Sequence, residues 1–126
     1  MSKKRVEKYI PEALNVLQQT FKNGKIPKEY NGYMSAFGAG LIQSGLKATV
    51  AIYENKNSET KEDKDKLTKI LLQIIDPNSK EDSLLRYIIQ QNKQNKNEKL
   101  LKDKIKDAAI AVKLAIRTFE LESKET

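Results

Sequence analysis

Apolar side chains recur at steps of three and four residues along most of this chain, which is the spacing of one face of an α-helix. The first stripe predicts a helix over much of residues 3–21. It consists of Val6, Ile10, Leu14, Leu17 and Phe21. Pro11 leaves two alternatives open: the regular helix begins near Pro11, or it begins near Ser2 and kinks, because an interior proline costs about 3 kcal/mol. Asn23-Gly24 then predicts the end of this helix.

The stretch from Tyr30 to Tyr53 carries one charged side chain, Lys47, in a chain that is 33% charged. It predicts two helices, one over about residues 28–44 and one that restarts at Leu46. Gly45 is expected to take the left-handed conformation between them. The small residues that share one face of the first helix predict close approach by another helix, and we expect the whole hairpin to be buried. These residues are Gly32, Ala36 and Gly40.

The second half of the chain alternates between polar segments and periodic ones. Residues 54–63 and 90–97 are polar and predict loops. Between them we expect a helix over about residues 64–75 and a further helix capped by Ser79. Residues 98–121 form the longest periodic segment and predict the last helix.

Together these segments predict an all-α fold, a single compact bundle of about six helices in one domain that covers residues 1–126. The chain has no cysteine, so disulfides and thiolate metal sites are excluded and the cytoplasm is the expected location. The uncharged stretch is long enough to cross a membrane. However, Lys47 would cost about 2.5–3.5 kcal/mol near the membrane centre, so we expect no membrane association.

Positive charge is concentrated in two parts of the chain. The formal net charge is +7, and residues 1–28 hold seven basic and two acidic side chains. Residues 91–106 hold six basic and two acidic ones. Two basic regions around a neutral middle favour a polyanionic partner. The alternative is that the lysines only keep the protein soluble.

The last predicted helix carries a basic stripe. At 100° per residue its cations fall within about 60° of one another, away from the apolar seam. They are Lys99, Lys102, Lys106, Lys113 and Arg117. A third face of the same helix is apolar and predicts contact with a neighbouring subunit. It consists of Ile110, Leu114 and Leu121.

The composition argues against catalysis. The chain has no histidine, which removes the commonest general base and metal ligand at neutral pH, and it has no cysteine nucleophile. Asp103 and Asp107 lie one turn apart and could share a metal ion, but lysines surround them. Gly38-Ala39-Gly40 completes no phosphate-binding motif. We therefore expect neither enzyme activity, nor a metal site, nor a cofactor.

The two central helices have a recognisable sequence. An aromatic and small-residue helix ends in Ser44-Gly45-Leu46, and Ala-Thr-Val-Ala-Ile-Tyr follows Lys47. This stretch resembles the small helical subunit of type III-B CRISPR (Cmr) RNA-targeting complexes; the rest of the chain matches by length and helix order. The resemblance implies a non-catalytic subunit in antiviral defence that lines the groove for guide RNA and target RNA. Its implied partners are other Cmr-type subunits and stacked copies of itself.

With this resemblance in mind, we expect RNA contact around the first loop, after the Gly-Leu turn and along the basic stripe. The expected residues are Lys22, Lys25, Lys28, Lys47, Lys106, Lys113 and Arg117. A rival hypothesis is a homo-oligomeric helical scaffold or adaptor with no nucleic-acid role. In that case the apolar face of the last helix would make the functional contacts.

Overall fold

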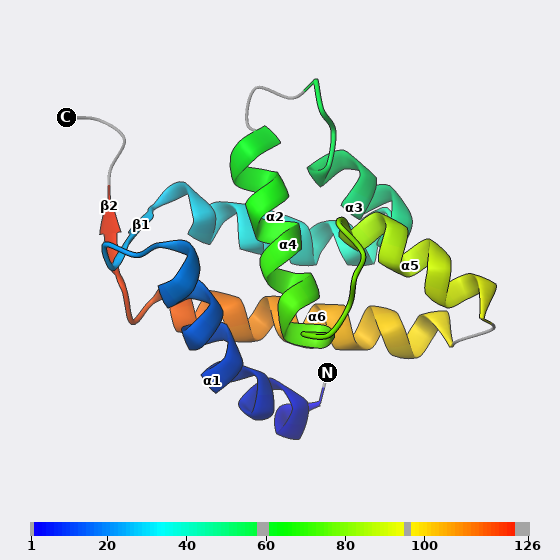
Figure 1. The fold of residues 1–126 in the computed structure, drawn as a ribbon, viewed down its shortest axis with the longest axis horizontal. Helices are drawn as coiled ribbons and strands as arrows, with labels where there is room; N and C mark the ends of the chain where they lie inside the picture. The colour runs from blue at the N-terminus through cyan, green and yellow to red at the C-terminus, as the bar shows by residue number, and fades with distance from the viewer. Residues whose placement is uncertain (1, 58–60, 95–96, 123–126) are drawn as a thin grey trace.

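The fold was obtained as a computed structural model, which describes residues 2–57, 61–94 and 97–122; of residues 61–63 and 122 only the backbone is described. Figure 1 shows a mostly helical molecule with a small pair of strands at one end. The elements, in chain order, are α1 (Lys3–Thr20), β1 (Lys25–Pro27), α2 (Glu29–Gln43), α3 (Leu46–Tyr53), α4 (Lys61–Ile75), α5 (Leu84–Lys93), α6 (Glu98–Ile116) and β2 (Glu120–Glu122). The predicted all-α fold with about six helices is confirmed.

Helix α1 begins at the chain start and runs through its proline. The Ser2 side chain accepts a hydrogen bond from the backbone N–H of Arg5 at 3.2 Å, so Ser2 is the N-cap. Pro11 lies inside the helix and is exposed. Of the two alternatives for this segment, the structure therefore selects the early start near Ser2.

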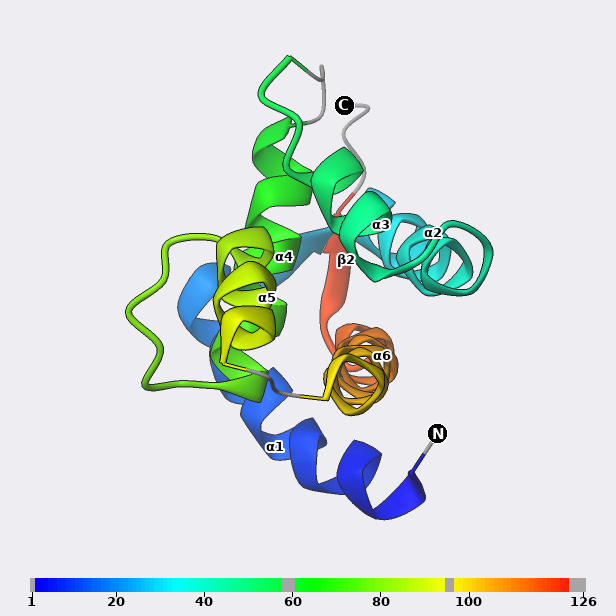
Figure 2. The same cartoon turned by 90° about the vertical axis from the view of Figure 1, so that its right-hand side faces the viewer.

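Helix α6 lies in the middle of the molecule and contacts α1, α2, α4 and α5. Figure 2 looks along α6 and shows α1 below it, α2 on one side and α4 with α5 on the other. Its buried side is rich in alanine, which lets neighbouring helices approach its backbone closely. The buried apolar residues are Leu101, Ile105, Ala108, Ala109, Ala111, Val112, Ala115 and Ile116.

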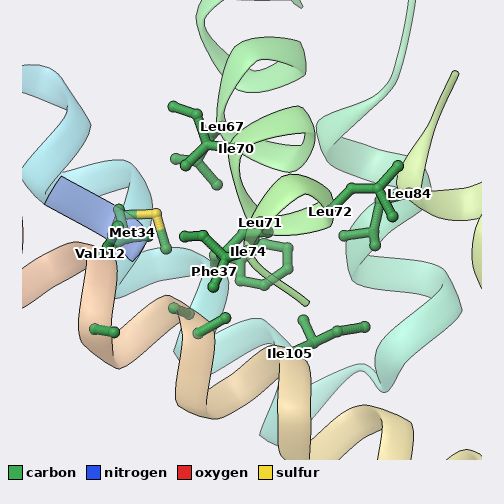
Figure 3. Close-up of a cluster of buried hydrophobic side chains, with 14 of the residues drawn as sticks. Met34, Phe37, Leu67, Ile70, Leu71, Leu72, Ile74, Leu84, Ile105 and Val112 are labelled. Carbon is green, nitrogen blue, oxygen red and sulfur yellow. The ribbon is translucent and has the colours of Figure 1, made fainter. Parts of the chain in front are cut away.

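The hydrophobic core forms where α4 faces α2 and α6. Met34 and Phe37 of α2 are buried here against residues of α4, while Ile105 and Val112 reach in from α6 (Figure 3). The residues from α4 are Leu67, Ile70, Leu71, Leu72 and Ile74. Leu84 closes the cluster from the start of α5. Helices far apart in the sequence thus share one core.

The turn between α2 and α3 is set by two glycines. Gly45 has φ 93° and ψ 169°, so the expected positive φ is present, although the backbone is extended rather than left-handed helical. A Cβ on Gly40 would lie 2.9 Å from Thr49 Cγ2, which is the close approach of α2 and α3. The Tyr53 hydroxyl donates a hydrogen bond of 2.7 Å to the Tyr33 carbonyl and fixes α3 against α2.

The prediction that the whole hairpin is buried was wrong for its outer side. Gly32 and Ala36 are exposed, and a Cβ on Gly32 would meet no described atom within 4 Å. Ile42 is 68% exposed and Ile52 is 58% exposed. The hairpin lies at the edge of the core: α4, α5 and α6 contact it, while these outward residues stay exposed. The small residues therefore form a surface, except at Gly40.

Several predicted ends need correction. Helix α4 begins at Lys61, inside the segment 54–63 expected to be a loop, and α5 continues to Lys93, inside 90–97. The N-cap of α5 is Ser83 rather than Ser79. Its first amides also donate to the Glu54 carboxylate, at 3.0 Å from Leu84 and 3.4 Å from Leu85. This long-range cap determines where α5 begins.

Helix α6 ends at Ile116, five residues before the predicted end. Residues 120–122 form β2 instead and pair in parallel with β1, so that Ile26 lies opposite Leu121. Ile26 is completely buried. The tail follows the strand because pairing satisfies its backbone groups while Ile26 fills the core. Within the described ranges, none of the helices is long and apolar enough to cross a membrane.

Candidate nucleic-acid interface

The solvent-facing side of α6 brings together the predicted cations of the last helix. The buried residues of α6 occupy one side of the helix, and the partly or fully exposed ones occupy the other. We call part of the exposed side the α6 strip. It consists of Lys106, Ile110, Lys113, Leu114 and Arg117. Helical spacing places the three cations within about 40° of one another, so one strand of a polyanion could meet all three.

Lys106 and Lys113 are half-buried. Lysines of this kind commonly bury their aliphatic stems and keep the ammonium group in water. Arg117 is exposed at the C-terminal end of α6. Among the described residues, no carboxylate lies within 4 Å of these three cationic groups. Within the described part of the chain, the cations of the strip are therefore not neutralised by an internal ion pair.

The first loop forms a second basic group. Lys22 and Lys28 are exposed on either side of β1, and Lys25 is the first residue of that strand. Parallel pairing places Lys25 opposite Glu120 of β2, which follows α6 closely in the chain. The loop lysines therefore lie at the end of the molecule where α6 and its Arg117 end (Figure 1). Glu120 partly offsets the positive charge there.

Lys47 lies apart from these residues. Its ammonium group lies 3.5 Å from the carboxylate of Glu98, the first residue of α6, and both side chains are about half exposed. A neighbouring cavity of about 360 Å³ is lined by Gly45, Leu46, Glu98, Lys99 and Lys102. Lys47 thus belongs to a third basic group at the opposite end of α6 from Arg117. An exposed ion pair of this kind contributes little to stability and can open for another anion.

The predicted apolar face of α6 is not separate from its basic stripe. Ile110 lies one turn from Lys106 and is half-buried, while Leu114 is adjacent to Lys113 and 40% exposed. Leu121 is exposed but belongs to β2 rather than to α6. Helical spacing therefore places Ile110 and Leu114 on the same surface as the cations, whereas Leu121 lies outside the helix.

The two aspartates considered as a metal site cannot act together. Asp107 is fully buried, and its carboxylate lies 2.7 Å from the Arg5 guanidinium. It also accepts hydrogen bonds from the backbone N–H of Ser2 at 3.3 and 3.4 Å. Asp103 lies on the partly exposed side. In the part of the chain that the structure describes, no three potential ligands converge on a metal site.

Two surface features were not foreseen from the sequence. The outward side chains of Ile42 and Ile52 are the most exposed large hydrophobic groups of the described chain. Lys4 and Lys8 line a cavity at the start of α1. The concentration of charge in the first 28 residues was a signal for the second feature. For the exposed Ile42 and Ile52, the only signal in the sequence was the low charge of the stretch from Tyr30 to Tyr53.

The tyrosines of the central hairpin belong to the core. Tyr30 and Tyr53 are buried, and their rings contact Phe21 and Phe37 edge to face, with centroids 5.2 Å apart in each pair. Tyr33 is half-buried. Rings held in this way cannot stack on bases. For Tyr30 and Tyr53, the expectation that the hairpin is buried is therefore confirmed.

Residues 1–116 match the family described as CRISPR-associated protein (Cas_Cmr5). No curated protein and no solved structure matches the chain. The family match covers every helix of the fold, including the whole of α6.

Proposed function

The chain belongs to the Cmr5 family, the small subunit of type III-B CRISPR complexes, and we propose that it lines the groove that holds guide RNA and target RNA. In this proposal the subunit is not catalytic. It contacts the sugar-phosphate backbone by charge and shape, while base pairing between the two RNAs reads the sequence. The absence of histidine and cysteine from the chain agrees with a role in binding rather than in chemistry.

The α6 strip carries the proposal. Lys106, Lys113 and Arg117 extend over about 16 Å of helix, a length that spans several phosphates of one strand. Their charges are free of internal ion pairs among the described residues. Lysine and arginine that neutralise phosphates release counterions, so the contact gains affinity at low salt without reading bases.

Two further basic groups extend this surface in the proposal. Lys22, Lys25 and Lys28 surround β1 at the end of the molecule where Arg117 lies. Lys47 is the candidate contact at the other end of α6, where its exposed pair with Glu98 must exchange for a phosphate. Lys47 is therefore expected to contribute less than the cations of the α6 strip.

Contacts with other Cmr subunits require apolar surface, for which the structure offers two candidates. The first is the predicted set Ile110, Leu114 and Leu121, which lies beside the cations and would compete with RNA for space. The second is the outward side of α2 and α3 with Ile42 and Ile52. We place the protein contact on α2 and α3 because it leaves the α6 strip open to RNA. Stacking of copies of the chain would use the same side.

The rival function is a homo-oligomeric helical scaffold. The exposure of Ile42 and Ile52 favours it, since exposed apolar side chains of this size drive self-association. The dependence of association on salt concentration distinguishes the two functions. RNA association should weaken steeply from low to moderate ionic strength, whereas apolar self-association should not.

The decisive experiment replaces the charges of the α6 strip in the assembled complex. The variant is Lys106→Gln, Lys113→Gln and Arg117→Gln, and retention of guide and target RNA is measured at several salt concentrations. The control removes the same charge from exposed positions outside the interface. It consists of Lys69→Gln, Lys80→Gln and Arg86→Gln.

The expected result is a several-fold loss of RNA retention in the α6 variant, with helix content unchanged in circular dichroism. The control should retain RNA like the wild type, apart from a small loss due to its lower net charge. Equal retention by the two variants at low salt would overturn the proposed role of the α6 strip.

A further inference from the structure

The start of α1 lines a cationic cavity. None of the residues predicted to contact RNA lies in it. The cavity has a volume of about 440 Å³ and lies between α1, the end of α4 and α6. We call it the α1 pocket. It is lined by Ser2, Lys4, Arg5, Lys8, Tyr9, Glu12, Ile74, Ile75, Pro77 and Lys104. Figures 1 and 2 show the first turns of α1 below α6 and the lower end of α4.

Three of the four cations in the α1 pocket have no carboxylate partner among the residues that the structure describes. Among the described residues, no ion pair engages Lys4, Lys8 or Lys104. The fourth cation, Arg5, is held by the buried Asp107 at 2.7 Å and fixes one wall of the cavity. Glu12 is the single carboxylate among the lining residues. Positive charge therefore exceeds negative charge in this cavity.

The lining of the pocket combines apolar and polar side chains, which suits a nucleotide phosphate with its sugar. Ile74 and Ile75 supply an apolar surface beside the cations. Tyr9, like any tyrosine, is protonated at neutral pH and can donate a hydrogen bond, and burial raises the pKa of its hydroxyl further. Volumes of this size are typical of small-ligand sites. Charge-assisted hydrogen bonds from lysine to phosphate are stronger than neutral ones.

We infer that the α1 pocket binds a phosphate group of the RNA backbone, as a second RNA contact on the opposite side of α6 from the α6 strip. Lys104 and Lys106 are two residues apart, so helical geometry directs them about 160° from each other. One short segment of RNA cannot meet both. This inference rests on the proposed function, because it assigns the anion to RNA.

The test measures binding of a single-stranded RNA oligonucleotide to the full chain by fluorescence anisotropy across a salt series. The pocket variant is Lys8→Gln with Lys104→Gln, which leaves the Arg5 and Asp107 pair intact. The matched control is Lys69→Gln with Lys80→Gln, two exposed lysines that do not line the cavity. A third variant, Glu12→Gln, removes the one opposing charge.

The inference predicts that the pocket variant loses about tenfold in affinity at low salt and that its salt slope falls by about one unit. Glu12→Gln should bind RNA several-fold more tightly, a gain that cannot come from unfolding. The control should stay within about twofold of wild type. Pocket variants that bind RNA like the control would overturn the inference.

Two more outcomes separate this inference from the proposed function. If the α6 variant loses RNA binding while the pocket variant and Glu12→Gln do not, the pocket inference fails and the proposed function stands. If no variant differs from the control, both fail. Inorganic phosphate is titrated separately by following the amide resonances of Lys8 and Lys104. Shifts with inorganic phosphate but not with RNA would make the cavity a small-anion site and overturn the assignment to RNA.

Discussion

The guanidinium of Arg5 lies 2.7 Å from the fully buried carboxylate of Asp107 and joins the first turn of α1 to the middle of α6. The same carboxylate accepts hydrogen bonds from the Ser2 backbone N–H. A negative charge at the start of α1 also complements the helix dipole, and α1 has no acidic residue of its own in its first turn. Asp107 thus anchors the chain start on α6, beside the α1 pocket.

Removing the arginine should destabilise the fold. Arg5→Ala leaves a buried carboxylate with only one backbone donor, and the expected loss is about 2–3 kcal/mol in the free energy of unfolding. The loss is smaller than for a fully buried pair because the Arg5 side chain is 26% exposed. Urea denaturation measures it. Arg86→Ala breaks an exposed pair with Asp82 and should change stability by less than about 0.5 kcal/mol. Equal effects of the two variants would contradict this account.

Two glycines should respond in opposite directions to the same substitution. Gly45→Ala forces an L-residue to φ 93° and should cost about 1–3 kcal/mol. Gly38→Ala adds a methyl group in the interior of α2, where nothing lies within 4 Å of the new Cβ, and should stabilise by about 0.5–1 kcal/mol. Thermal melts of both variants decide the point. An unchanged melting temperature for Gly45→Ala would refute the backbone argument.

The carboxylate of Glu54 should matter for α5 although 30 residues separate them. Glu54→Ala removes the acceptor for the amides of Leu84 and Leu85 and should cost about 1–3 kcal/mol. Hydrogen exchange should show the effect locally, with faster exchange at these two amides than in α1 or α6. Uniform protection across all helices in the variant would argue that the cap is not stabilising.

Ionisation of the Tyr53 hydroxyl should make the stability of the fold depend on pH in the alkaline range. The pKa of Tyr53 is raised from 10.0 to about 12. Burial is the main cause, and the interaction with Tyr33 adds to it. The unfolded chain therefore loses this proton at lower pH than the folded one. The contribution of Tyr53 to stability is complete below pH 10 and is lost as pH rises towards 12.

Tyr53→Phe tests this effect by urea unfolding at several pH values. At neutral pH the variant should lose about 1 kcal/mol, because the hydrogen bond to the Tyr33 carbonyl is gone. Between pH 10 and 12 its stability should fall less steeply than that of the wild type. Tyr87, whose pKa burial also raises to about 12, remains in both proteins and serves as an internal reference. Parallel pH profiles would exclude Tyr53 as the cause.

The helices were predictable from the sequence because their apolar residues keep the helical period, as in Val6, Leu17 and Ile105. The ends were less predictable, since they depend on distant residues. Ser79 and Ser83 are equally good caps in sequence, and the Glu54 carboxylate, brought in by folding, determines that α5 begins after Ser83. Likewise, α6 ends early because the tail pairs with β1.

Only the part of the candidate site that lies on a single helix could be predicted from the sequence. Lys106, Lys113 and Arg117 share a face of α6 because spacing along a helix fixes direction. The α1 pocket could not be foreseen, because it joins Lys8 of α1 to Lys104 of α6 across the core. Small residues such as Gly32 can indicate either close packing or a smooth surface, and the sequence does not distinguish the two.

The most direct test of the central claim, that this subunit holds RNA through its cations, is affinity purification of the tagged chain from its native cell. We expect guide RNA and larger Cmr subunits to co-purify with the wild type. With Lys106→Gln, Lys113→Gln and Arg117→Gln, the protein subunits should remain and the RNA yield should fall. A homo-oligomer free of nucleic acid, or an RNA yield equal to that of the wild type, would contradict the claim.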